Sequence, residues 1–115
     1  RDALSARDVI KKTLNATGPI PAETPFYSVE WLDQTAIYYL GRPMTLVSGF
    51  DELEMGAGLE PNKVVATTDA WIKRWTDGPP AYAFMRRTTW QKLQEAGVPM
   101  RLVAESADKV VVARR

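Results

Sequence analysis

The sequence contains no histidine and no cysteine. Without cysteine the chain has no disulfide, no thiolate nucleophile and no thiol-bound zinc. Without histidine it also lacks the Ser-His and Cys-His nucleophile systems, and a metal site would need oxygen ligands alone. Chemistry in this chain is therefore limited to carboxylates, lysine, tyrosine, serine and threonine.

A strong excess of one charge is also missing. The formal net charge is +1, from 15 Lys and Arg against 14 Asp and Glu. This balance gives no reason to expect nucleic acid as a partner. Because no apolar run approaches the roughly 18 residues of a membrane helix, we expect the chain as given to be soluble. It begins at Arg1 without a Met or a recognisable signal peptide, which suggests a piece or processed product of a longer protein.

Length and composition fit one folded domain. The 115 residues are enough for one hydrophobic core and too few for two. Hydrophobic residues at 45% and charged residues at 25% are close to globular averages, which argues against disorder. We therefore expect a single soluble domain over residues 1–115. Within it, residues 1–24 form an N-terminal helix and Pro-rich connector, and residues 25–115 form an α/β core.

Hydrophobic spacing and helix breakers predict alternating strands and helices. The expected helices cover about 2–15, 31–40, 68–78 and 88–97. The expected strands are 26–29, 44–47, 64–66, 81–85, 100–105 and 109–115. Residues 50–63 predict a short helix or loop, because two glycines and a proline interrupt them.

Cap residues and connection lengths predict how these elements join. Thr68 is the expected N-cap of the third helix, and Thr88 with Gln91 matches a capping box for the fourth. Gly41 and Gly97 predict helix ends. The strand-helix-strand over 26–47 predicts a right-handed βαβ unit, strand 81–85 is expected to be central, and the last two strands predict a hairpin. The fold class is therefore α/β, a three-layer α/β/α sandwich with a mixed sheet of about five strands that ends in an antiparallel hairpin.

One βα unit concentrates aromatic and hydrogen-bonding side chains at the carboxyl end of a parallel strand, where ligands of open α/β sheets gather. The candidate ligand-binding residues are Tyr27, Trp31, Asp33, Gln34, Tyr38 and Arg42. Such a set suits a sugar or a polar lipid head group. The alternative is that the rings fill the core between helix and sheet.

Other candidate groups favour structural roles. The acids Asp51, Glu52 and Glu54 suit a hard metal ion or an acid and base pair, but the first turn of a helix, where Asp and Glu are favoured, explains them better without a ligand. The strand-to-helix junctions lack the glycines of a phosphate-binding loop. We predict no catalytic residue and no metal ligand in this chain. The tryptophans expected to anchor the core are Trp71, Trp75 and Trp90.

The segment TPFYSVEWLDQTAIYYLGRPMTLV resembles the soluble C-terminal domain of bacterial 4-amino-4-deoxy-L-arabinose transferases and related membrane glycosyltransferases. A Tyr-Ser-Val strand end, Asp-Gln-Thr, a Tyr-Tyr-Leu-Gly-Arg helix end and a Leu-Val strand occur in that order. Asp-Glu-Leu and Glu60-Pro61 follow, and then Arg74-Trp75, AYAFM and GVPMRLVAE continue the similarity. The resemblance spans about residues 25–115. Glu30 departs from it, because a small residue is expected there.

The resemblance implies a GT-C-class parent enzyme, related to protein mannosyltransferases, in the bacterial inner membrane. Such enzymes move a sugar from a polyprenyl-phosphate carrier to an acceptor on the periplasmic side, which for the aminoarabinose transferases is lipid A. The resemblance also implies that the catalytic carboxylates, and any divalent metal, lie in the membrane portion, so this chain needs no cofactor of its own. The sugar added to a lipid phosphate lowers negative surface charge, weakening the binding of cationic peptides such as polymyxin.

By this reading the chain is an accessory, non-catalytic domain on the periplasmic side. Its partners are the membrane domain of the same polypeptide and, near it, the polyprenyl-phosphate sugar and lipid A. Two alternatives stay open from the residues. One is a free-standing module that binds a small ligand with the Tyr27 to Arg42 cluster, and the other is an enzyme that relies on the 51–54 acids alone. Long apolar segments encoded before Arg1 would favour the accessory domain.

Overall fold

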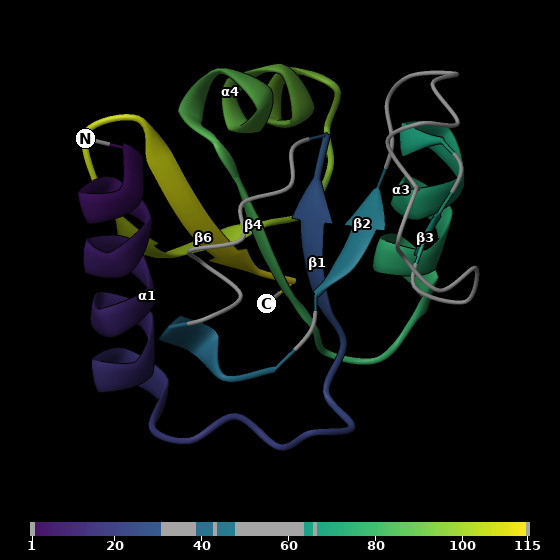
Figure 1. Ribbon diagram of the computed structural model, residues 1–115. Coiled ribbons are helices and arrows are strands. Elements are labelled where there is room, and N and C mark those ends of the chain that lie inside the picture. Colours follow the sequence, from purple (N-terminus) through teal and green to yellow (C-terminus); the bar gives the residue numbers. More distant parts are fainter. Residues whose placement is uncertain (1, 31–38, 43, 48–63, 66, 115) are drawn as a thin grey trace.

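The computed structural model describes residues 2–30, 39–42, 44–47, 64–65 and 67–114. Figure 1 shows helices packed around one twisted sheet. The described elements, in chain order, are α1 (Asp2–Thr17), β1 (Phe26–Val29), β2 (Thr45–Val47), β3 (Val64–Val65), α3 (Thr68–Asp77), β4 (Tyr82–Arg86), α4 (Arg87–Glu95), β5 (Arg101–Glu105) and β6 (Lys109–Ala113).

The sheet has six strands in the order β3-β2-β1-β4-β6-β5. Strand β1 pairs in parallel with β2 and β4, and β2 pairs in parallel with β3. Strand β6 runs antiparallel to both β4 and β5. The predicted mixed sheet, its central fourth strand and its closing hairpin are confirmed. The short strand expected at 64–66 forms as the Val64–Val65 pair at the edge of the sheet, so the sheet has six strands where about five were expected.

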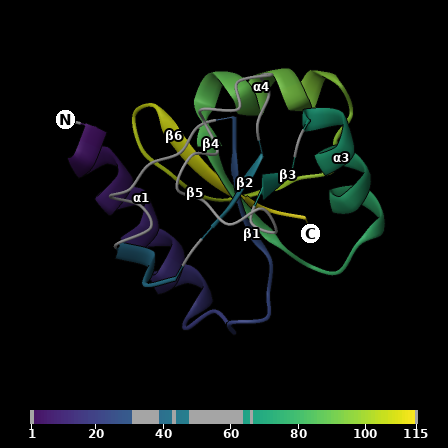
Figure 2. The same ribbon diagram turned by 45° about the vertical axis from the view of Figure 1, so that its right-hand side comes forward.

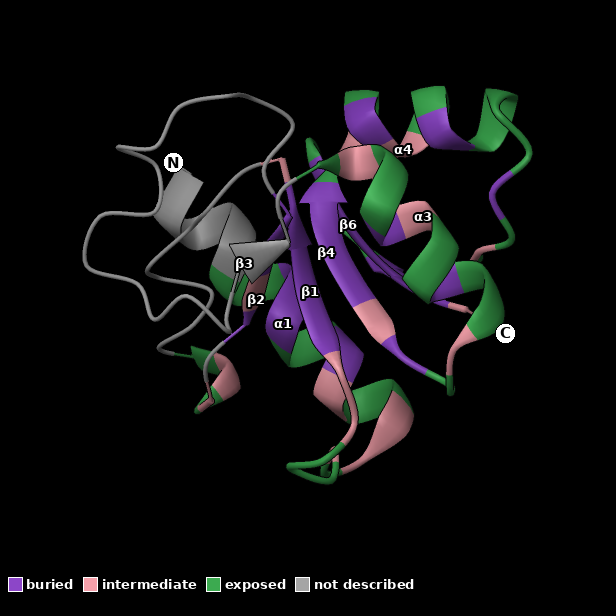
Figure 3. Ribbon diagram, turned by 90° about the vertical axis from the view of Figure 1, so that its right-hand side faces the viewer, coloured by how far each residue is buried: buried purple, intermediate pink, exposed green. Residues whose placement is uncertain are grey.

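Helices cover both faces of the sheet, so the predicted three-layer α/β/α arrangement is confirmed (Figures 1 and 2). Helix α1 packs against β5 and β6, whereas α3 and α4 lie on the other face. Every residue of β1 and β6 is buried, as expected for strands covered on both sides. Figure 3 shows this burial along the strands and the buried stripes of α3 and α4 that face them.

Neighbouring residues of a strand contribute to two separate hydrophobic clusters, because successive side chains point to opposite faces. On β1, Phe26 belongs to the cluster beneath α1, whereas Tyr27 and Val29 belong to the cluster beneath α3 and α4. On β4, Phe84 and Met85 divide in the same way. The sheet is therefore the shared middle layer of two cores.

Helix α1 confirms the predicted N-terminal helix. Val9, Ile10 and Thr13 are fully buried on its inner side. The buried hydroxyl of Thr13 donates a hydrogen bond to the carbonyl oxygen of Val9 at 2.8 Å, so its polar group is satisfied within the helix. The helix ends at Thr17, two residues beyond the predicted end.

Both predicted helix N-caps were wrong, each by a short step along the chain. The N-cap of α3 is Thr67, whose hydroxyl accepts a hydrogen bond from the backbone N–H of Ala70 at 3.1 Å. Helix α4 begins directly after β4, and Arg86 at its N-cap makes no side-chain capping bond. Thr88 therefore lies inside the first turn. The backbone N–H of Arg87 is satisfied instead by the carbonyl of Asp108 in the hairpin loop, at 2.9 Å.

The predicted helix ends at glycine are confirmed where the structure describes them. After α4 the N–H of Gly97 donates to Gln94 at 3.0 Å and that of Val98 to Leu93 at 3.1 Å, the Schellman pattern. Gly97 has φ +85, which suits a residue without a Cβ. Tyr39 and Leu40 are helical and Gly41 follows them, but the rest of the predicted 31–40 helix and the 50–63 segment lie outside the described residues.

Candidate functional site

Glu30 follows β1 directly at the carboxyl edge of the parallel strands. Among the described residues it is the single non-glycine with positive φ, at 62°. A left-handed backbone costs an L-residue roughly 1–2 kcal/mol. Its N–H donates to the carbonyl oxygen of Val47 at 2.6 Å, so this conformation joins the ends of β1 and β2.

The Glu30 carboxylate connects three elements. One of its oxygens accepts a hydrogen bond from the Thr68 hydroxyl on α3 at 2.6 Å. The other lies 3.8 Å from the ammonium group of Lys92 on α4, and the Glu30 side chain is 17% exposed. From β1 the chain continues to β2 and then to β3 on one side of β1, and it then returns to β4 on the other side of β1. The strand order therefore reverses between β1 and β4, and Glu30 lies at this topological switch point.

Sequence reasoning missed Glu30 as a site residue. Two signals pointed to it: it directly follows a buried strand, and it stands where the family resemblance led us to expect a small residue. A small residue is compatible with positive φ, whereas glutamate needs compensation from its contacts. The partners Thr68 and Lys92 supply contacts of that kind.

The two described members of the predicted ligand cluster lie apart. Tyr27 is 8% exposed and packs edge-on against Trp71 and Trp75, with ring centroids 6.0 Å and 6.3 Å away. Its ring thus fills the core, as the alternative reading expected. Arg42 is half-buried against the connector and donates to the carbonyl of Pro21 at 3.0 Å. Burial lowers the pKa of Arg42, an effect that the nearby Glu23 carboxylate partly opposes.

The other predicted site residues lie outside the part of the chain that the structure describes. They are Trp31, Asp33, Gln34 and Tyr38 of the ligand cluster, and Asp51, Glu52 and Glu54 of the acidic group. The predicted core anchors are confirmed, because Trp71 and Trp75 are almost fully buried and Trp90 packs against the same cluster.

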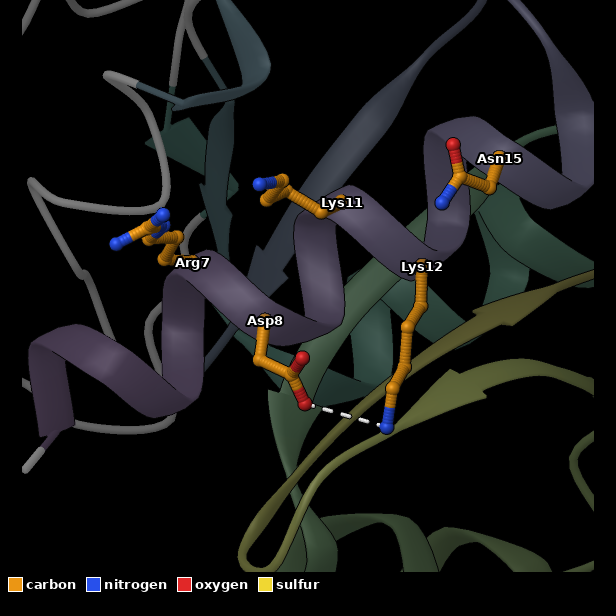
Figure 4. Close-up of a pocket in the computed structure, with 5 residues that line it drawn as sticks. All are labelled: Arg7, Asp8, Lys11, Lys12 and Asn15. Atoms are coloured by element: carbon orange, nitrogen blue, oxygen red, sulfur yellow. Dashed lines mark ion pairs between the residues drawn. The ribbon is translucent and has the colours of Figure 1, made fainter.

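The outer side of α1 carries a charged hollow. Its volume is about 430 Å³, and the described residues that line it are Arg7, Asp8, Lys11, Lys12 and Asn15. Figure 4 shows Arg7 and Lys11 extending to one side of the helix, away from Asp8 and Lys12. Asp8 and Lys12 form an ion pair at 3.2 Å.

A second hollow lies beside the end of α1, where it meets residue 40. It has a volume of about 420 Å³ and is mainly apolar, and its described lining is Leu14, Gly18, Pro19, Ile20 and Leu40. Tyr39, next to Leu40, is 39% exposed, and the Arg7 guanidinium lies 5.9 Å from the centre of its ring.

Over residues 2–30 and the other described ranges, no group of three or more acidic side chains is placed to hold a metal ion. None of the helices described is long and apolar enough to cross a membrane. The fold and the site together define a structural class. It is a three-layer α/β domain in which polar side chains at the carboxyl edge of the sheet link a strand to the helices that cover it.

Comparison with known proteins identifies the family within that class. The model of the aminoarabinose transferase C-terminal domain matches residues 13–114, and the chain belongs to this family. The predicted resemblance is therefore confirmed, and the match begins earlier than residue 25. No relative among curated proteins matches the chain.

Two solved structures are similar to the chain over almost its whole length. Both are of ArnT from Cupriavidus metallidurans, one in the apo state and one bound to undecaprenyl phosphate. They are 34% and 35% identical to this chain, each with a TM-score of 0.81. Each match covers 99% of this chain but 20% of the ArnT chain, so the sequence corresponds to a small part of that protein.

Proposed function

We propose that this chain is the accessory C-terminal domain of a membrane glycosyltransferase. The parent enzyme moves an aminoarabinose-like sugar from a polyprenyl-phosphate carrier to a lipid A-type acceptor, on the periplasmic side of the bacterial inner membrane. The observation that carries this proposal is the family match over residues 13–114, together with the likeness to an ArnT of which the chain spans 20%.

The composition and side-chain contacts of this domain agree with a non-catalytic role within the parent enzyme. Its composition lacks the histidine and cysteine of common nucleophile systems. Its best-placed carboxylate, that of Glu30, is engaged by Thr68 and Lys92. In this proposal the reacting groups, and any divalent metal that assists them, belong to the membrane portion of the same polypeptide, as the family resemblance implies. This domain supports that portion by packing against it.

The polyprenyl carrier is supported by a related protein. The Cupriavidus metallidurans ArnT was crystallised with undecaprenyl phosphate, which is a polyprenyl phosphate. A sugar moved from such a carrier to a lipid A phosphate masks negative charge at the outer surface of the cell. This masking reduces the attraction of cationic peptides such as polymyxin.

Deleting the domain from the parent tests the proposal. The intact parent, expressed in bacteria without a transferase of their own, is expected to add aminoarabinose to lipid A, detected by mass spectrometry of the extracted lipid. The parent without this chain is expected to lose the added sugar while its membrane portion accumulates to a comparable level. An intact parent that leaves lipid A unmodified in cells supplied with the donor would contradict the proposal.

A free-standing ligand-binding module remains the alternative. It was predicted from the Tyr27 to Arg42 cluster, of which Tyr27 fills the core and Arg42 contacts the connector. Titration of the chain with sugars, nucleotides and lipid head groups tests it. Saturable binding of a free sugar by the chain alone would favour this alternative over an accessory role.

A further inference from the structure

From residue 7 onward, the outer surface of α1 carries an excess of positive charge that α3 lacks. Over that part of the helix the exposed charged side chains are Arg7, Asp8, Lys11 and Lys12. The exposed charged side chains of α3 are Asp69, Lys73, Arg74 and Asp77, which cancel. On α1, Asp8 neutralises Lys12 through their ion pair at 3.2 Å, leaving Arg7 and Lys11 as the net charge.

Arg7 and Lys11 lie one turn apart on the same side of α1 (Figure 4). Like charges at this spacing repel and disfavour a helix slightly, so the pair does not serve the stability of α1. The Arg7 guanidinium lies over the exposed Tyr39 ring at 5.9 Å. Such stacking occupies a face of the guanidinium and leaves its N–H groups available for an anion such as a phosphate.

An apolar surface adjoins these cations. Leu14, which lines the apolar hollow, is followed by Asn15, which lines the charged one. Leu40 of the apolar hollow is preceded by Tyr39, the partner of Arg7. Figures 1 and 2 both show residues 39–42 beside α1. Cations, a half-exposed tyrosine and an apolar hollow therefore share one side of the molecule, which we call the α1 surface.

We propose that the α1 surface docks on the anionic phospholipid surface of the bilayer. Arg7 and Lys11 contact lipid phosphates, Tyr39 lies at the headgroup level, and the apolar hollow lined by Leu14, Ile20 and Leu40 receives acyl-chain carbons. This pattern of basic, aromatic and apolar groups is the one that interfacial segments use. The inference rests on the proposed function, because that function anchors the domain close to a membrane.

Vesicle binding by the 115-residue chain tests the inference. The chain is expected to sediment with phosphatidylcholine vesicles that contain phosphatidylglycerol and to stay in solution with phosphatidylcholine alone. Each cation near an anionic surface contributes about 1 kcal/mol, a factor of about five. Arg7→Gln with Lys11→Gln should therefore weaken partitioning about 30-fold, and molar salt should abolish it because it shortens the Debye length to about 3 Å.

A matched control removes the same charge from the opposite face. Lys73→Gln with Arg74→Gln on α3 is expected to leave partitioning within about twofold, because both residues are exposed on the helix that faces away from α1. Tyr39→Ser, which keeps the charge, is expected to weaken partitioning several-fold. All three variants should keep the circular dichroism of the parent chain, since the replaced side chains are exposed.

Several outcomes would overturn the inference. Equal losses in the α1 and α3 pairs would show that net charge alone drives binding, and equal sedimentation with neutral vesicles would exclude lipid phosphates. Binding that needs undecaprenyl phosphate in the vesicles would indicate a carrier site. The vesicle assay does not depend on sugar transfer, so the two proposals can fail separately. A parent that leaves lipid A unmodified would contradict the proposed function, whereas the vesicle assay alone decides whether the α1 surface binds anionic lipid.

Discussion

Glu30 shows how one side chain stabilises an unfavourable backbone. Its positive φ at the end of β1 costs roughly 1–2 kcal/mol. The compensation comes from its N–H bond to Val47 and from the bond that its carboxylate accepts from Thr68. A hydrogen bond to a charged group stabilises a protein by about 1.5–3 kcal/mol when water is excluded from it. Because the Glu30 side chain is 17% exposed, we expect the bond from Thr68 to contribute near the lower limit of this range.

Removing the Thr68 hydroxyl tests this compensation. Thr68→Val keeps the shape of the side chain and is expected to lower the free energy of unfolding by about 1–2 kcal/mol, measured by urea denaturation. Thr76→Val, at an exposed position of the same helix, should change it by less than about 0.5 kcal/mol. In a Glu30→Gln background the cost of Thr68→Val should shrink. An unchanged cost there would mean that the hydroxyl acts through another group.

At the scale of the element, the two helices on one face begin in different ways. Helix α3 uses the side chain of Thr67, whereas α4 uses a backbone carbonyl from the hairpin loop that connects β5 and β6. Arg87 reinforces that second contact, because its guanidinium donates to the Ser106 carbonyl at 2.6 Å and pairs with Glu105 at 2.8 Å. Tertiary structure thus replaces a local cap.

The two helix starts should respond differently to loss of a threonine. Thr67→Ala is expected to cost about 1 kcal/mol of unfolding free energy, because the N–H of Ala70 loses its acceptor. Thr88→Ala should change stability by less than about 0.5 kcal/mol, since Thr88 is exposed and no side chain caps α4. Thermal unfolding of both variants measures this difference. A larger loss of stability for Thr88→Ala would instead support the capping box that the sequence predicts.

The elements could be predicted because their signals are local. The runs FYSV and KVVVA are apolar and rich in β-branched or aromatic residues, which suits strands covered on both faces. The cap of α4 could not be predicted, because its acceptor on Asp108 is distant in sequence. The α1 surface was missed for a similar reason: Arg7 and Tyr39 come together only in the fold.

At the scale of the whole molecule, two hydrophobic clusters share one sheet. Ile10 and Phe84 belong to the cluster beneath α1, and Trp75 and Met85 to the one beneath α3 and α4. Alternate residues of β1, β4 and β6 contribute side chains to the two clusters. Loss of packing in one cluster should therefore lower the free energy of unfolding of the whole domain.

Ile10→Ala tests this coupling. Ile10 is fully buried, so its truncation should lower the free energy of unfolding by about 2–5 kcal/mol. Circular dichroism and tryptophan fluorescence should still report one coincident transition, although Trp71 and Trp75 lie on the other face. Leu102→Ala on β5, where the side chain is 37% exposed, should cost much less. Separate transitions for the two probes would show that the layers unfold independently.

The packing of α1 against β5 and β6 constrains how the chain folds as it is made. Helix α1 is synthesised before the sheet, whereas β5 and β6 are the last strands of this sheet to be made. The inner side of α1, with Val9 and Ile10, cannot be covered by its partners until translation has passed residue 113. During that interval the nascent helix exposes an apolar stripe, which makes it a natural target for a chaperone.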